Sequence, residues 1–158
     1  MTFFHTAEGW LVLSTIKELC TKEIIAWDFD TGATVDLAIK TLNKITYCKN
    51  AILHSDQGGT YTSPMYMDTA ESYNLVLSYS KKKIVMTMLV WKIFMGTLNQ
   101  RHLSVTYNSA LLFKKGGTQK KIINNYITWY NNERIQAKLN CLSPVEFHLK
   151  NYQQTVAI

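Results

Sequence analysis

A four-residue apolar run, Ala51–His54, stands between two segments of helical character and constrains the fold most strongly. Four residues are too few for a helix, but they are enough for a strand that is buried on both faces. Before it, Val35–Ile45 has apolar residues at helical spacing, and after it Pro64 is typical of a helix's first turn. This order predicts a parallel strand reached through a helical crossover, and therefore an α/β domain.

The segments on either side extend this prediction to a mixed sheet flanked by helices. Further strands are expected to end near His5 and to cover Trp10–Ile16, Glu23–Phe29 and Leu75–Leu77, so that the antiparallel strands come first. Further helices are expected over Ile84–Leu98, over Thr118–Asn132 and from Ser143 onward. We predict one domain over residues 1–150 and a tail over residues 151–158.

The composition supports a folded domain with a basic surface. The 158 residues are 47% hydrophobic and 18% charged and include only 2 prolines and 7 glycines, which excludes a disordered or collagen-like chain. The formal net charge of +6 favours a polyanionic partner, although many basic domains bind none.

Cysteine usage and the apolar segments bear on location. Cys20, Cys48 and Cys141 are far apart and odd in number, which suggests neither a zinc site nor a disulfide framework. The first residues lack the basic region of a signal peptide. Ile84–Leu98 is too short to span a bilayer and contains Lys92, so we expect a buried helix there. The expected location is cytoplasmic, with no membrane partner.

Four segments, in order along the chain, resemble one family. They are residues 6–11 (TAEGWL), 52–63 (ILHSDQGGTYTS), 126–134 (YITWYNNER) and 142–146 (LSPVE). Together they resemble the integrase-like catalytic core of bacterial insertion-sequence transposases of the retroviral-integrase type. The resemblance covers nearly the whole chain, and the four segments are far more specific together than any one alone.

This resemblance implies a ribonuclease H-like fold and the cleavage and joining of DNA strands. In the family, three carboxylates hold two Mg²⁺ or Mn²⁺ ions, since hard cations prefer oxygen ligands and two close dications need several anionic groups. Asp56 matches the second carboxylate and is the expected catalytic and metal-binding residue. Gln57, Ser80, Lys81 and Lys82 are the expected DNA contacts, although a basic run such as residues 81–83 is equally typical of a solvated surface.

The sequence departs from the family at the other two carboxylates. The first would align immediately before Met1, so we expect an incomplete N-terminal strand. At the family's spacing after Asp56 the sequence has Lys92, with Phe94 and Gly96 in register. Only one carboxylate of three remains, and we predict that the chain is catalytically inactive. Decay of an insertion sequence or a sequence error would each explain Lys92, and Lys92 could form an ion pair with Asp56 in place of a metal.

Other interpretations of these residues stay open. The chain could be a non-catalytic DNA-binding or interfering subunit that associates with an intact transposase or with itself, or a pseudogene product without function. The aromatic residues Tyr126, Trp129 and Tyr130 are more typical of a core than of a base-stacking surface. His54 is more typical of a buried, hydrogen-bonded histidine than of a metal ligand, and Asn131 is expected to hold the C-terminal segment against the core.

Overall fold

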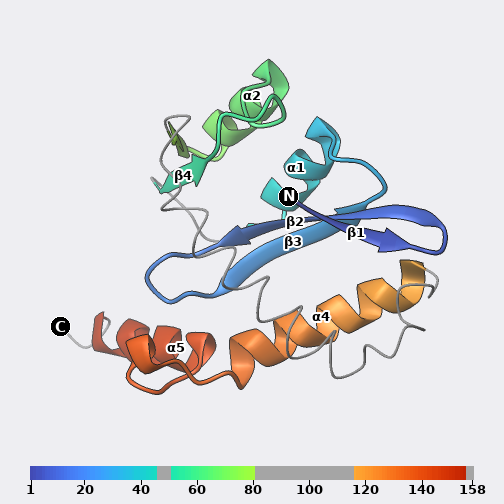
Figure 1. Ribbon diagram of the computed structural model, residues 1–158. Coiled ribbons are helices and arrows are strands. Elements are labelled where there is room, and N and C mark those ends of the chain that lie inside the picture. Colours follow the sequence, from blue (N-terminus) through green and yellow to red (C-terminus); the bar gives the residue numbers. More distant parts are fainter. Residues whose placement is uncertain (46–50, 81–115, 156–158) are drawn as a thin grey trace.

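The computed structural model describes residues 1–45, 51–80 and 116–155. It has the predicted order of three antiparallel strands followed by alternating helices and strands (Figure 1). The elements are β1 (Thr2–Thr6), β2 (Gly9–Lys17), β3 (Ile24–Asp30), α1 (Val35–Leu42), β4 (Ile52–Ser55), α2 (Pro64–Ser72), β5 (Val76–Tyr79), α4 (Gly116–Asn132), a 3-10 turn (Ala137–Leu139) and α5 (Pro144–Thr155). The expected helix over Ile84–Leu98 lies outside the described residues. The division at residue 150 stays a prediction, and α5 runs across it.

The sheet contains antiparallel and parallel pairs, as predicted, in two hydrogen-bonded parts. The antiparallel part has the order β1-β2-β3, and the parallel part pairs β4 with β5. The β1–β2 hairpin is closed by the two residues between Thr6 and Gly9, and the Thr6 hydroxyl donates to the Gly9 carbonyl at 2.8 Å. Gly9 has φ +116°, which favours glycine there.

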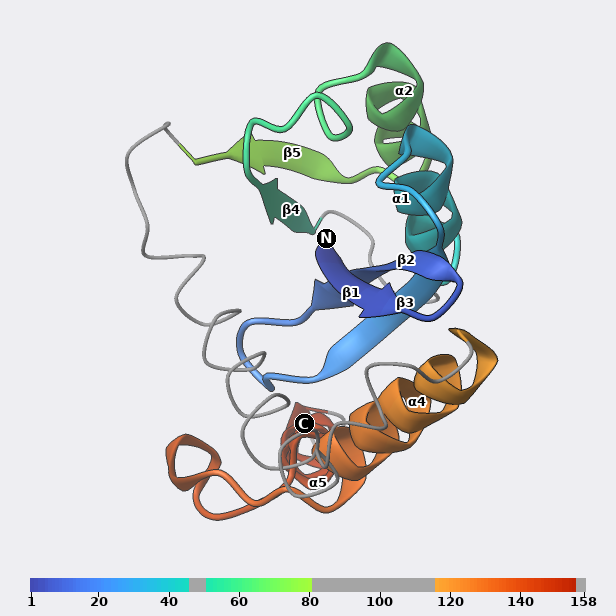
Figure 2. The ribbon, with the colours of Figure 1, turned by 45° about the vertical axis from the view of Figure 1, so that its right-hand side comes forward.

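Helices cover both faces of the antiparallel part. Figure 2 shows α1 and α2 on one side of it and α4 and α5 on the other. Tyr126, Ile127 and Tyr130 of α4 pack with Leu11 and Leu13 of β2 in one buried cluster. A second cluster joins α1 and α2 to the β4–β5 pair, with Leu42, Tyr66 and Leu75 at its centre. The structure therefore confirms that Tyr126 and Tyr130 belong to the core.

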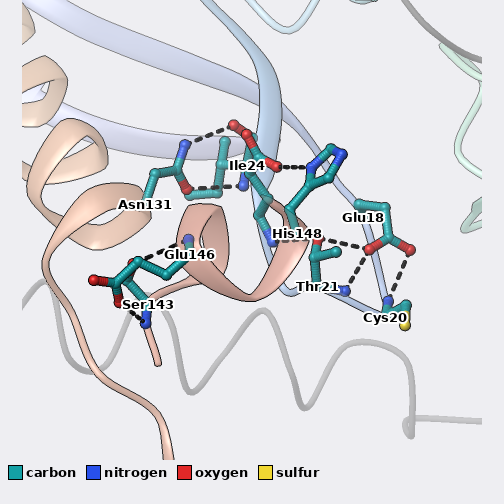
Figure 3. A network of polar contacts seen from close by, with 9 residues as sticks. Glu18, Cys20, Thr21, Ile24, Asn131, Ser143, Glu146 and His148 are labelled. Atoms are coloured by element: carbon teal, nitrogen blue, oxygen red, sulfur yellow. Dashed lines mark hydrogen bonds and ion pairs between the residues drawn. The ribbon is translucent and has the colours of Figure 1, made fainter. Parts of the chain in front are cut away.

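Polar contacts fasten the C-terminal helices to the β2–β3 hairpin (Figure 3). The Asn131 side chain accepts from the Ile24 N–H at 3.0 Å and donates to the Ile24 carbonyl at 2.9 Å, as expected for a residue that anchors this segment. His148 of α5 lies 2.9 Å from a Glu23 carboxylate oxygen. Ser143 caps α5, and Glu146 accepts from the Ser143 N–H at 2.8 Å, which satisfies polar groups at the helix start.

Candidate functional site at the end of β4

Asp56 directly follows β4, at the carboxyl end of the parallel pair, where ligand and catalytic groups collect in open α/β sheets. Its side chain is exposed, and Oδ1 accepts from the Gly58 N–H at 2.9 Å. A Cβ added at Gly58 would lie 2.9 Å from the same oxygen. Gly58 therefore lets the chain turn closely around the carboxylate, which explains why a residue without a side chain stands at this position.

Hydrogen bonds between the neighbourhoods of β4 and β5 hold the backbone just before Asp56. Ser80, which follows β5, donates to the Ser55 carbonyl from its backbone N–H at 3.0 Å and from its hydroxyl at 3.3 Å. The His54 ring lies 3.0 Å from the Ser78 hydroxyl, in agreement with a hydrogen-bonded histidine in the sheet. These contacts link β4 to β5 just before the carboxylate and hold its backbone in one position.

Tyr61 and the Met1 amine lie close enough to Asp56 to interact with its charge, and neither is among the predicted site residues. The Met1 nitrogen is 3.5 Å from the Tyr61 hydroxyl. Burial, and then the negative charge of Asp56, raise the pKa of Tyr61 to about 12. Burial lowers the pKa of the Met1 amine, while Asp56 opposes that shift. Tyr61 belongs to the same sequence motif as Asp56, and the resemblance, which aligns the family's first carboxylate immediately before Met1, implies that the chain begins near Asp56.

A cavity of about 460 Å³ opens beside this carboxylate, between the two parts of the sheet. Thr15, Ile16 and Lys17 of β2 line one wall, and the residues of β4 together with Asp56 line the other. The described residues hold no group of three or more His, Cys, Asp or Glu side chains that could bind a metal ion together. Their carboxylates therefore do not form the donor set that two divalent cations require.

The predicted site residues divide between described and undescribed parts of the chain. Gln57 is exposed beside Asp56, whereas the Ser80 hydroxyl is engaged with the Ser55 carbonyl. Lys81, Lys82 and Lys92 lie outside the described residues, and so does the predicted ion pair between Lys92 and Asp56. Their roles, and the metal-binding role of Asp56, stay predictions. Within the described ranges, no helix has the length and apolarity needed to cross a membrane.

Sequence comparisons identify relatives along almost the whole chain. Residues 1–83 and residues 105–152 each match an integrase core domain family. A transposase-like protein of Haemophilus influenzae is 32% identical over 154 residues, which cover 96% of this chain and 69% of that protein. The putative transposase InsK of Escherichia coli is 27% identical over 152 residues, which cover 92% of this chain and 51% of that protein. The chain thus spans between half and about two thirds of these relatives' lengths.

Solved structures show the same fold at low sequence identity. The catalytic core of BIV integrase matches with a TM-score of 0.69 and 12% identity, covering 99% of this chain and 95% of that one. An HTLV-2 integrase catalytic core in complex with magnesium matches with a TM-score of 0.65 and 12% identity, covering 93% and 90%. These likenesses confirm the ribonuclease H-like fold. The family matches, together with the H. influenzae relative, show that this chain belongs to the integrase core domain family of the insertion-sequence transposases.

Proposed function

We propose that this chain is a DNA-binding member of the transposase family that does not cut or join DNA strands on its own. The observation that carries the proposal is the donor set around Asp56. The described residues supply no cluster of three metal-binding side chains. The resemblance aligns Lys92 with the family's third carboxylate, which is a Glu. A replacement of Glu by Lys changes the local charge by two units, in the direction that repels a dication.

The metal chemistry of the relatives therefore does not transfer to these residues. The HTLV-2 integrase core is in complex with magnesium. Two Mg²⁺ or Mn²⁺ ions would need several anionic oxygens, because close dications repel each other unless ligands compensate their charge. Asp56 alone supplies one carboxylate, and its Oδ1 already accepts from the Gly58 N–H. The described residues therefore do not fit a pair of metal ions.

Affinity for DNA is the family property that survives loss of the metal site. The net charge of +6 attracts the phosphate backbone, and in the sequence Lys81 and Lys82 come after Ser80, just beyond the end of β5. Contacts between lysine and phosphate provide affinity without sequence choice. Gln57, exposed beside Asp56 at the carboxyl end of β4, is the proposed polar contact.

The test measures binding and nicking on the same DNA. The 158-residue chain is titrated onto a labelled duplex that carries the terminal inverted repeat of an insertion sequence, at increasing NaCl concentration. We expect binding that weakens steeply with salt, and no nicking in Mg²⁺ or Mn²⁺. A K81A/K82A variant should bind more weakly, whereas Lys138→Ala, an exposed lysine on the 3-10 turn, should leave binding unchanged.

Two results would overturn the proposal. Nicking that depends on Mg²⁺ and disappears in Asp56→Ala would show that the chain is an active nuclease. Binding that is absent at low salt, with the protein shown to be folded by circular dichroism, would remove the DNA-binding role. Mixing the chain with an intact transposase, and measuring whether strand transfer falls, separately tests the predicted association with such a subunit.

A further inference from the structure

Basic side chains gather around Tyr130, where the end of α4 meets the β2–β3 hairpin. The Lys17 ammonium donates to the Tyr130 hydroxyl at 2.8 Å and lies 5.0 Å from the centre of the ring. The guanidinium carbon of Arg134 lies 5.2 Å from the same ring centre. Lys22 is close enough for its charge to act on both Lys17 and Tyr130. We call Lys17, Lys22 and Arg134 the cation cluster.

The cation cluster is built by segments that other contacts hold together. Lys17 ends β2, Lys22 belongs to the turn between β2 and β3, and Arg134 comes shortly after the end of α4. The Lys22 ammonium donates to the Leu19 carbonyl within the same turn. Asn131 fastens α4 to the start of β3 through its two hydrogen bonds. The three cations therefore come from β2, the turn after it and the end of α4, and the start of the chain contributes none of them.

The positive charges of the cluster repel one another. Burial, which disfavours the charged form, and then the like charges of Lys22 and Arg134 lower the pKa of Lys17 to about 8. All 11 Asp and Glu residues of the sequence fall within the described ranges, and neither Lys22 nor Arg134 forms an ion pair with any of them. An anion bound between these side chains would relieve the repulsion.

A hydrogen-bond donor without an acceptor lies at the same place. Among the described residues, the buried Nε2 of Gln136 has no hydrogen-bond partner. Burial raises the pKa of Tyr130, and Gln136 lies near enough to the Tyr130 hydroxyl to oppose this shift. The Gln136 backbone is fixed, because its N–H donates to the Leu142 carbonyl at 3.1 Å and its carbonyl accepts from the Leu139 N–H at 2.9 Å. A buried donor without an acceptor is unfavourable, and a ligand oxygen would satisfy it.

We propose that the cation cluster and Gln136 together bind a phosphate group. The Lys22 ammonium, the Arg134 guanidinium and Gln136 Nε2 donate to its oxygens, and the guanidinium can bind two of them side by side. The charge of Lys17 adds to the attraction. A phosphate group suits donors from several directions better than a carboxylate does, because the two carboxylate oxygens lie in one plane with few directions of approach. The group belongs to the DNA backbone or to a free phosphate compound, and this inference does not depend on the DNA-binding function.

The experiment titrates the 158-residue chain with inorganic phosphate at constant ionic strength and follows the Gln136 side-chain amide by NMR. We expect a saturable shift of this amide, and acetate at the same ionic strength should produce none. Arg134→Gln should weaken phosphate binding about tenfold or more, which corresponds to about 1.4 kcal/mol. Lys138→Gln is the matched control, because it removes the same charge from an exposed lysine on the 3-10 turn that follows Gln136. The control should bind phosphate like the parent chain.

A titration with duplex DNA identifies the source of the phosphate group. If the group belongs to the DNA backbone, Arg134→Gln should reduce the slope of log affinity against log salt concentration by about 1, whereas Lys138→Gln should not. An unchanged slope, together with binding of inorganic phosphate, would assign the site to a free phosphate compound. Absence of duplex binding would contradict the proposed function, and the titration with inorganic phosphate would still test this site.

Three results would overturn the proposal. The first is the absence of a saturable shift up to about 30 mM phosphate, a concentration that nearly fills a site with a Kd of about 1 mM. The second is equal binding of acetate, which would indicate a site for the carboxylates of an acidic peptide. The third is equal phosphate binding by Arg134→Gln and Lys138→Gln. The first two are measured on the unmodified chain, so they decide the matter even if Arg134→Gln does not fold.

Discussion

Replacement of Asn131 by leucine tests how the C-terminal helices are held to the sheet. The Asn131 side chain is 7% exposed and forms two hydrogen bonds with the backbone of Ile24, at 3.0 Å and 2.9 Å. Ile24 itself is 1% exposed, at the start of β3. Leucine is similar in shape to asparagine but has neither a donor nor an acceptor. The substitution therefore leaves the buried N–H and C=O of Ile24 without these partners.

The expected cost follows from those two groups. Each buried backbone group that loses its partner lowers the free energy of unfolding by about 1–3 kcal/mol. Burial of the apolar leucine side chain offsets part of this loss. We expect Asn131→Leu to lower the free energy of unfolding by about 2–4 kcal/mol. The free energy of unfolding of a single domain is about 5–15 kcal/mol, so this loss is large enough to measure easily.

Urea denaturation followed by circular dichroism measures this difference, with Asn132→Leu as the matched control. Asn132 is the next residue of α4, but its side chain is exposed and donates only to the Thr128 carbonyl within the same helix. The control should stay within about 0.5 kcal/mol of the parent. If Asn131→Leu is no more destabilising than Asn132→Leu, the two hydrogen bonds to Ile24 do not hold α4 on the sheet, and the reasoning fails.

Three further substitutions test the electrostatics and the capping. Burial, followed by the charges of Lys22 and Arg134, lowers the pKa of Lys17 to about 8, so the unfolded chain binds the proton more tightly. The free energy of unfolding should therefore rise from pH 8 towards pH 10, and this rise should flatten in Lys17→Met. Burial acts to raise the pKa of Glu18, but hydrogen bonds from Cys20 and Thr21 outweigh it and lower the pKa. Stability contributed by Glu18 should be lost as the pH falls below its ordinary pKa, and the acid sensitivity should decrease in Glu18→Gln. Ser143→Ala removes the cap of α5 and should cost about 1 kcal/mol in thermal denaturation.

The sequence predicted those features that depend on neighbouring residues. The Ala51–His54 run became β4, shifted by one residue, because a short apolar segment between helices has few other solutions. The prediction that this strand is buried on both faces was wrong, since none of its four residues is buried and Ile52 is 71% exposed. Thr34 and Ser63 accept hydrogen bonds from the N–H groups at the starts of α1 and α2, as local capping rules require. The position of Asp56 after β4 followed from the same local pattern.

Contacts between distant residues could not be predicted in this way. Lys17 and Tyr130 are 113 positions apart, and no pattern near either residue indicates that they form a hydrogen bond. The register of the β1–β2 pair, in which Thr2 lies opposite Leu13 and Thr6 opposite Gly9, likewise depends on both strands and not on either one alone. Periodicity identifies a strand and its buried face, but it does not fix how far two strands overlap.

The residues that hold the fold differ from those that would perform catalysis, and Asp56 allows this separation to be measured. Its side chain is exposed, and among the described residues it accepts one hydrogen bond, from the Gly58 N–H, which water can replace. Asp56→Ala should therefore change the free energy of unfolding by less than about 1 kcal/mol. Asn131→Leu, at a buried position, should lower the free energy of unfolding several times more. If Asp56→Ala unfolds the protein as readily as Asn131→Leu, the carboxylate is structural after all. If it does not, the fold does not depend on the Asp56 carboxylate, and loss of a metal ligand at this position would leave the folded domain intact.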